Sequence, residues 1–104
     1  MIQFFKKIFG IGPATNYRLL MQNGAAIIDV RTPQEYKNGH IQGSINLPLD
    51  SIKSNFSKIR KDKPVITCCA SGMRSGVAKK ILKANGFENV YNGGSWNGLM
   101  HKIH

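Results

Sequence analysis

Two adjacent cysteines, Cys68 and Cys69, are the residues of this chain best suited to chemistry. Cys69 follows a short apolar run and precedes a loop of small residues that leads to Arg74. Gly72 permits a positive φ, and because the loop lacks proline, each of its residues can donate a backbone N–H. If the loop curls around Cys69, these amides and the N-terminus of a following helix form a cradle for an anion. Cys69 is therefore the candidate nucleophile.

The free energy needed to lower the pKa of the Cys69 thiol indicates how much of the loop must take part. A free thiol has a pKa of about 8.5, so only about 3% of it is thiolate at pH 7. Lowering that pKa by two units needs about 2.7 kcal/mol, whereas a helix dipole supplies only about 0.3–1 kcal/mol. Charge-assisted bonds from several amides must supply the rest, helped by the fixed charge of Arg74. The alternative, a buried cysteine that merely ends a strand, leaves the small-residue loop and Arg74 unexplained.

Length and composition predict one globular domain over residues 1–104, since 41% of the residues are hydrophobic. No apolar run approaches the roughly 18 residues of a membrane span. Lys6 and Lys7 interrupt the first apolar residues, so residues 1–11 are predicted to form an amphipathic arm packed on the domain. A peripheral membrane contact and a degenerate export signal remain alternatives.

The cysteine pair also bears on the compartment. A bond between neighbouring cysteines is strained and staples nothing, and no spacing of the zinc-binding type is present. We therefore expect a cytoplasmic protein without a metal.

The formal net charge is +10, from 15 Lys and Arg against 5 Asp and Glu. The lysines are scattered and do not alternate with aromatic residues, which favours a solvated basic surface over nucleic-acid binding. A preference for small anions or acidic partner proteins is the next interpretation. We expect a monomer that binds no nucleic acid.

The helices and strands that must position the loop are predicted from the periodicity of the apolar residues and from the glycine, proline and asparagine residues between the periodic segments. Four compact apolar runs predict strands, over residues 25–30, 44–47, 64–68 and 89–91. Periodic segments predict helices over residues 15–21 with Thr15 as cap, over 32–38, from 50 or 51 through 59, over 75–85, and after a turn at residues 93–94. Strands that alternate with helices predict a parallel α/β sheet, whose ligands bind beyond the carboxyl ends of the strands.

One helix start has a specific mechanism. Thr32 can cap, Pro33 takes the first helical position, and Glu35 can reach back as in a capping box.

The loop from Cys69 to Ser75 resembles the active-site loop of rhodanese-like sulfurtransferases. Three further segments resemble that family in the same order: Ile28–Tyr36, Gly39–Pro48 and Tyr91–Trp96. The resemblance covers about residues 12–103. It implies a rhodanese-like five-stranded parallel sheet flanked by helices on both faces.

The resemblance also implies a ping-pong reaction. Cys69 takes sulfane sulfur from an anionic donor such as thiosulfate, carries it as a persulfide, and passes it to cyanide or a thiol. Arg74 would bind the donor, and no organic cofactor or metal is implied. The backbone N–H groups of the loop would hold the outer sulfur; they belong to Ala70, Ser71, Gly72, Met73, Arg74 and Ser75.

Residues outside the loop receive supporting roles. In rhodanese-like domains, residues at the positions of Asp29 and Arg31 look mostly structural. They tie loops together behind the site by hydrogen bonds. His40 is interpreted as a loop-fixing hydrogen-bond partner rather than a general base, because an existing thiolate needs no strong base. Trp96 is predicted to pack in the core.

Several alternatives stay open. The same fold hosts phosphatases and arsenate reductases with a loop one residue longer, and counting from Cys68 gives that spacing. Gly72 fits the count from Cys69 better. Cys68 is then a core residue, or alternatively a resolving thiol. A relay module between proteins, and a scaffold whose thiol chemistry is incidental, complete the candidates.

Overall fold

The structure is a computed structural model that describes residues 14–104. The expected arm at residues 1–11 lies outside the described residues. Helices and strands alternate in the order α2 (Tyr17–Gln22), β1 (Ala26–Asp29), α3 (Pro33–Lys37), β2 (Ile45–Asn46), η1 (Leu49–Lys58, a 3₁₀ segment), β3 (Val65–Cys69), α4 (Met73–Ala84), β4 (Val90–Ser95) and α5 (Trp96–Ile103).

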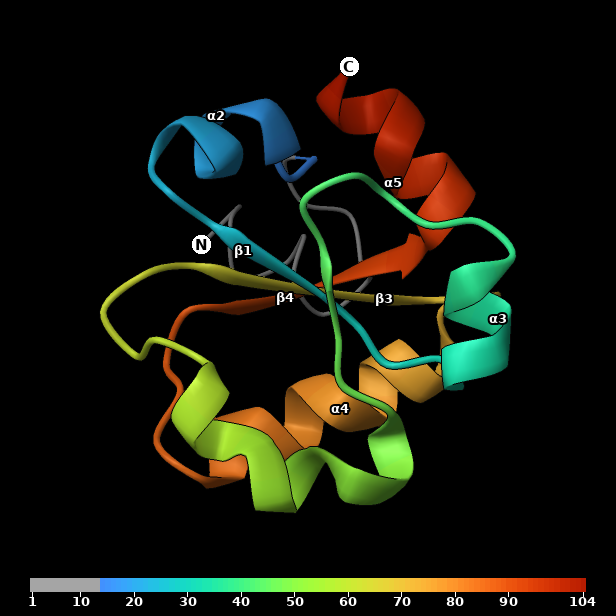
Figure 1. Cartoon of the computed structure of the whole chain (residues 1–104). Helices are drawn as coiled ribbons and strands as arrows, with labels where there is room; N and C mark the ends of the chain where they lie inside the picture. Colours follow the sequence, from blue (N-terminus) through green and yellow to red (C-terminus); the bar gives the residue numbers. More distant parts are fainter. Residues whose placement is uncertain (1–13) are drawn as a thin grey trace.

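The four strands form one parallel sheet in the order β2-β1-β3-β4. Helices α2 and α5 cover one face, and η1 and α4 cover the other (Figure 1). The predicted parallel α/β class is thus confirmed, but the five-stranded sheet is wrong for residues 14–104, which hold four strands. The four apolar runs each form a strand, whereas the segments between them form helices and turns that satisfy their backbone groups locally.

The central strands are buried on both faces, which is why they read as continuous apolar runs. Every residue of β3 is buried, and its side chains alternate between two cores. The core under η1 and α4 includes Ile28, Val65 and Leu82. The core under α2 and α5 includes Ile66 and Leu99. Burying each such side chain contributes about 1.5–3 kcal/mol to folding.

The capping box at the start of α3 is confirmed. The Thr32 hydroxyl accepts the Glu35 N–H at 3.2 Å, and the Glu35 carboxylate accepts the Thr32 N–H at 3.1 Å. The predicted cap at Thr15 is wrong, because α2 begins one residue later. Asn16 Oδ1 takes the capping position by accepting the Leu19 N–H at 3.1 Å.

Two boundaries near the cysteines also differ from the predictions. Helix α4 begins at Met73 rather than Ser75. Strand β4 continues through residues 93–94, which were predicted to turn. A Cβ on Gly93 would lie 2.8 Å from Leu99 Cδ2 and 2.9 Å from Ile66 Cγ2. Glycine at position 93 lets β4 lie closely against β3 and α5, whereas Gly94 has no such neighbours and adopts φ +82°.

None of the helices within residues 14–104 is long and apolar enough to cross a bilayer.

Candidate active site

Cys69 is the last residue of β3, and its sulfur is the focus of the loop that follows. Its Sγ accepts the backbone N–H of Gly72 at 3.0 Å and that of Ser75 at 3.4 Å. The Ser75 hydroxyl lies 3.3 Å from the same sulfur. Gly72 closes the loop at φ +102°, where a side chain would be strained and would also approach Gly94 Cα to 3.3 Å. The loop therefore curls over the sulfur.

These contacts change the acidity of the thiol. Burial alone raises the pKa of Cys69, because it penalises the charged form. Hydrogen bonds from the Ser75 hydroxyl and from the N–H groups of Ser75, Gly72 and Ser71 outweigh that effect, so the pKa of Cys69 lies below its ordinary value. The loop thus stabilises a thiolate.

Cys68 has the opposite environment. It is fully buried in the core under α2 and α5, beside Ile66 and Leu99. Burial, followed by the nearby carboxylate of Asp29, raises the pKa of Cys68 to about 12. Because side chains alternate along β3, the two thiols point to opposite faces of the sheet. The loop is built around Cys69, so the count from Cys68 that suits a phosphatase finds no support in the geometry. Cys68 is placed as a core residue.

Asn92 on β4 holds the loop from outside, a contact that sequence reasoning missed. Its Nδ2 donates to the Gly72 carbonyl at 3.0 Å. Its Oδ1 accepts the Gly94 N–H at 3.0 Å and lies 2.7 Å from the Ser75 hydroxyl, whose single proton can point to Asn92 or to the Cys69 sulfur. The only cue in the sequence is an asparagine directly before the glycine pair.

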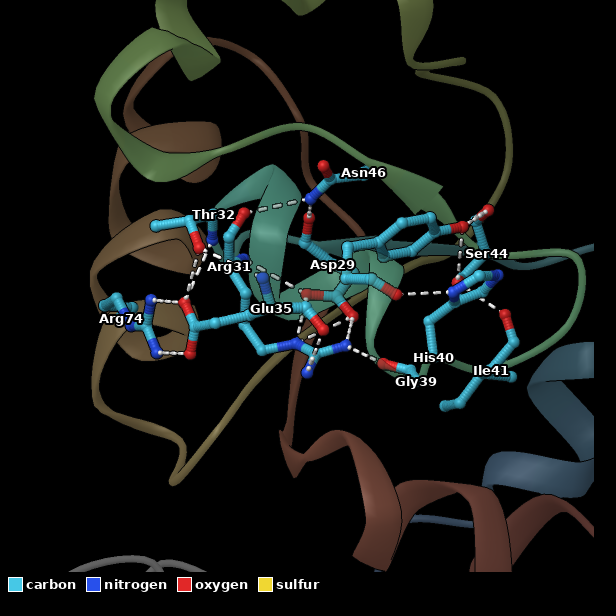
Figure 2. Close-up of polar contacts among 11 residues, drawn as sticks. Asp29, Arg31, Thr32, Glu35, Gly39, His40, Ile41, Ser44, Asn46 and Arg74 are labelled. Carbon is cyan, nitrogen blue, oxygen red and sulfur yellow. Dashed lines mark hydrogen bonds and ion pairs between the residues drawn. The ribbon is translucent and has the colours of Figure 1, made fainter.

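Arg74 extends away from the loop to Glu35 on α3 (Figure 2). Its two terminal nitrogens meet the two carboxylate oxygens at 2.7 and 2.9 Å. Hydrogen bonds from Arg74, and then from Thr32, lower the pKa of Glu35 to about 2. Glu35, the glutamate of the capping box, is therefore charged and forms an ion pair with Arg74 of the loop. Sequence reasoning saw the capping box but not this pairing.

Asp29 and Arg31 form a buried ion pair (Figure 2). Asp29 is the register partner of Cys68 on β3, so its side chain lies on the face of the sheet opposite Cys69. Arg31 donates Nε to Asp29 Oδ1 at 2.9 Å and Nη2 to Oδ2 at 2.7 Å. The same guanidinium donates to the carbonyls of Gly39, at 2.6 Å, and Glu35, at 3.3 Å. The pair ties β1 to α3, which carries Glu35.

Comparison with known proteins assigns the chain to a family. The model of the rhodanese-like domain family matches residues 13–100. The chain belongs to the rhodanese-like family. Over 69 residues it is 42% identical to "Thiosulfate sulfurtransferase PspE" of Escherichia coli, covering 64% of this chain and 66% of PspE. Over 87 residues it is 34% identical to "Thiosulfate sulfurtransferase GlpE" of Pseudomonas syringae, covering 84% of this chain and 78% of GlpE. A solved "rhodanese with anions from E. coli" is 37% identical, with a TM-score of 0.67, covering 71% of this chain and 89% of that one.

Another relative limits what the comparison says. The chain is 46% identical over 68 residues to "Uncharacterized protein YqhL" of Bacillus subtilis. The match covers 65% of this chain and only 54% of YqhL, so the chain spans about half of that relative.

The remaining predicted residues take positions around this rhodanese-like site. In the loop, Ala70, Ser71 and Met73 are exposed, Met73 at 79%. His40 Nδ1 lies 2.7 Å from the Tyr36 carbonyl and the two rings stack, so the expected loop-fixing contact is present. Trp96 packs against the core under α5, and the Arg31 guanidinium lies 4.9 Å from its ring centre. In the described part of the chain, no three His, Cys, Asp or Glu side chains gather as metal ligands would.

Proposed function

We propose that this rhodanese-like chain is a sulfurtransferase that carries sulfane sulfur on Cys69 as a persulfide. The observation that carries the proposal is the convergence of the Gly72 N–H, the Ser75 N–H and the Ser75 hydroxyl on one sulfur. They favour the thiolate, which is the reactive form of cysteine. Relatives named thiosulfate sulfurtransferase support the same reaction class.

In the loading half-reaction, the Cys69 thiolate attacks the outer sulfur of thiosulfate. A Cys69–sulfur bond forms, the sulfur–sulfur bond of thiosulfate breaks, and sulfite leaves with the electron pair. The outer sulfur of the persulfide is an anion that also needs donors. We assign to it the loop amides that make no contact with Sγ, those of Ala70, Met73 and Arg74.

In the unloading half-reaction, cyanide or a thiolate attacks the outer sulfur. The Cys69–sulfur bond breaks, and Cys69 departs as a thiolate. A thiol of low pKa is the better leaving group. The hydrogen bonds to Cys69 Sγ therefore assist both half-reactions.

Arg74 is suited to steer the donor although it is paired. Its contacts with Glu35 use two of the five guanidinium N–H donors, so three remain for an anion. A cavity of about 60 Å³ lies beside Arg74, between Val30, Thr32 and Leu49. Its lining also includes Pro48 and Asp50 but not Cys69, so this cavity borders Arg74 and not the sulfur.

We further propose that the chain acts as a monomer in a reducing compartment. One chain supplies every contact described around Cys69 Sγ: the loop, Ser75 on α4 and Asn92 on β4. Both cysteines are free thiols, and the thiolate of Cys69 has to stay reduced to attack a donor.

A relay between proteins is the second candidate, favoured by the exposure of Met73 next to the sulfur. It uses the same persulfide and differs in taking sulfur from a protein rather than from thiosulfate.

The test is the intact mass of the reduced protein after incubation with thiosulfate. We expect wild type and Cys68→Ser to gain one sulfur and Cys69→Ser to gain none. Loss of the adduct in Cys68→Ser alone contradicts the assignment of Cys69. No adduct from thiosulfate, with an adduct from a persulfidated peptide, selects the relay. No adduct from either donor overturns the proposed function.

A further inference from the structure

One face of α4 is exposed and continues from the active-site loop. Met73, Val77 and Lys80 follow one another at the spacing of a single helix face, and all three are exposed. Met73 and Val77, at 79% and 48% exposed, are two of the four large hydrophobic residues exposed in residues 14–104. We call Met73, Val77, Lys80 and Lys83 the α4 stripe. It is apolar beside the sulfur and basic farther along the helix.

The charge around the stripe is one-sided. Helix α4 carries four basic residues and no acidic one, and η1, which packs against it, adds Lys53 and Lys58 against Asp50. The three ion pairs formed within residues 14–104 all use arginine and leave the lysines out. The lysines of α4 and η1 are therefore available to pair with carboxylates of a partner.

We propose that the α4 stripe is the docking surface for an acidic protein that presents a thiol to the persulfide of Cys69. The proposal rests on the proposed function and names its acceptor. Apolar contact at Met73 and Val77 places the partner next to the sulfur and excludes water there. Carboxylates of the partner meet Lys80 and Lys83.

The transfer is balanced without another reactant. The partner's thiolate attacks the outer sulfur, so a new sulfur–sulfur bond forms on the partner. The bond between Cys69 Sγ and that sulfur breaks, and Cys69 keeps its electron pair as a thiolate. One persulfide and one thiolate are present before and after the step, so no net oxidation occurs.

The length of the stripe predicts how salt acts. Lys80 lies seven residues beyond Met73, which is about 10 Å along a helix. The Debye length is also about 10 Å at 0.1 M ionic strength. Charges of this kind mainly raise the rate of encounter, so salt should slow transfer to an acidic partner and leave transfer to a small neutral thiol unchanged.

The first experiment measures sulfur transfer from the persulfidated protein to two synthetic peptides of equal length, each with one cysteine. One peptide is rich in Asp and Glu with one leucine, and the other carries Asn and Gln at the same positions. We expect the acidic peptide to react about tenfold faster at low salt.

The variants Lys80→Glu and Val77→Ser test the stripe. Lys80→Glu should remove most of the acidic peptide's advantage, and Val77→Ser should slow transfer to both peptides. The matched control is Lys102→Glu, which makes the same charge change on α5 across the sheet (Figure 1). It should keep the advantage, and all three variants should keep the rate with cyanide. Equal rates for the two peptides, or equal losses in Lys80→Glu and Lys102→Glu, overturn the proposal.

A second experiment separates failure of the surface from failure of the chemistry. Serine replaces cysteine in the acidic peptide, and binding to the sulfur-free protein is followed by amide NMR shifts. Shifts gathered on α4, and lost in Lys80→Glu, support the surface even if Cys69 takes up no sulfur. Shifts elsewhere, or none, overturn it even if thiosulfate loads Cys69.

Discussion

Cys68 and Cys69 are neighbours in the chain and opposites in environment. Cys68 points into the core under α2 and α5, where burial and Asp29 raise its pKa to about 12. Cys69 points to the other face, where hydrogen bonds from the loop lower its pKa despite burial. One step along a strand reverses the face of the sheet. The contrast shows that the loop, and not proximity in sequence, sets which thiol has the lowered pKa.

The polar groups near each thiol divide in the same way. On the Cys68 face, the Asp29–Arg31 ion pair is nearly inaccessible and ties β1 to α3. On the Cys69 face, Ser75 and Asn92 meet the sulfur or hold the loop around it. The ion pair should therefore affect mainly the free energy of unfolding, and Ser75 and Asn92 should affect mainly the pKa of Cys69.

The largest effect is expected on the Cys68 face. Arg31→Ala leaves the carboxylate of Asp29 buried without its ion-pair partner and with only the backbone N–H of residue 31 to meet it, which costs about 3–5 kcal/mol of the free energy of unfolding. Urea denaturation of wild type and variant measures the loss. The double variant Asp29→Asn, Arg31→Met leaves no buried charge and should lose less. A loss under about 1 kcal/mol in Arg31→Ala contradicts a structural role for the pair.

On the Cys69 face, Ser75→Ala removes the hydroxyl beside the sulfur. A hydrogen bond to a charged group contributes about 1.5–3 kcal/mol, and one pKa unit equals about 1.4 kcal/mol. The pKa of Cys69 should rise by about one unit, so the thiolate forms at a higher pH. Ultraviolet absorbance of the thiolate against pH measures the shift. Ser51→Ala, whose hydroxyl bonds the Pro48 carbonyl on η1, should leave the pKa in place.

Asn92→Asp should produce a smaller shift in the same direction. The carboxylate keeps the acceptor for Ser75, loses the donor to the Gly72 carbonyl and adds a negative charge near the thiolate. We expect the pKa of Cys69 to rise by about half a unit, so the thiolate again forms at a higher pH. Asn85→Asp, with the same charge at the far end of α4, is the control. An unchanged pKa in Asn92→Asp would remove that residue from the account.

The smallest effect is expected from a change at Cys68 itself. Cys68→Ala deletes one buried sulfur and should reduce the free energy of unfolding by about 1 kcal/mol. The pKa of Cys69 and its uptake of sulfur should not change. A rise in that pKa similar to that of Ser75→Ala would mean that the two faces are coupled.

The local parts of this arrangement could be predicted from the sequence. The four strands follow from apolar runs, the start of α3 follows from its capping box, and the loop follows from small residues after Cys69. The helix start at Met73 was missed because only Gly72 in a left-handed conformation sets it.

The parts that escaped prediction depend on contacts distant in sequence. Arg74 meets Glu35 across 39 positions, and Ser75 meets Asn92 across 17. No local periodicity encodes such pairs. The fifth strand came from the family resemblance and not from a fifth apolar run, and the sheet of the described residues has four strands.

The most direct test of the central claim is an ultraviolet titration of the two single-thiol variants. Cys68→Ala leaves only Cys69, and we expect its thiolate to appear with a midpoint below the ordinary value of about 8.5. Cys69→Ala leaves only Cys68, and we expect no thiolate to appear in that range. Midpoints near 8.5 in both variants, or an early midpoint in Cys69→Ala alone, would contradict the claim that the loop activates Cys69 and spares its neighbour.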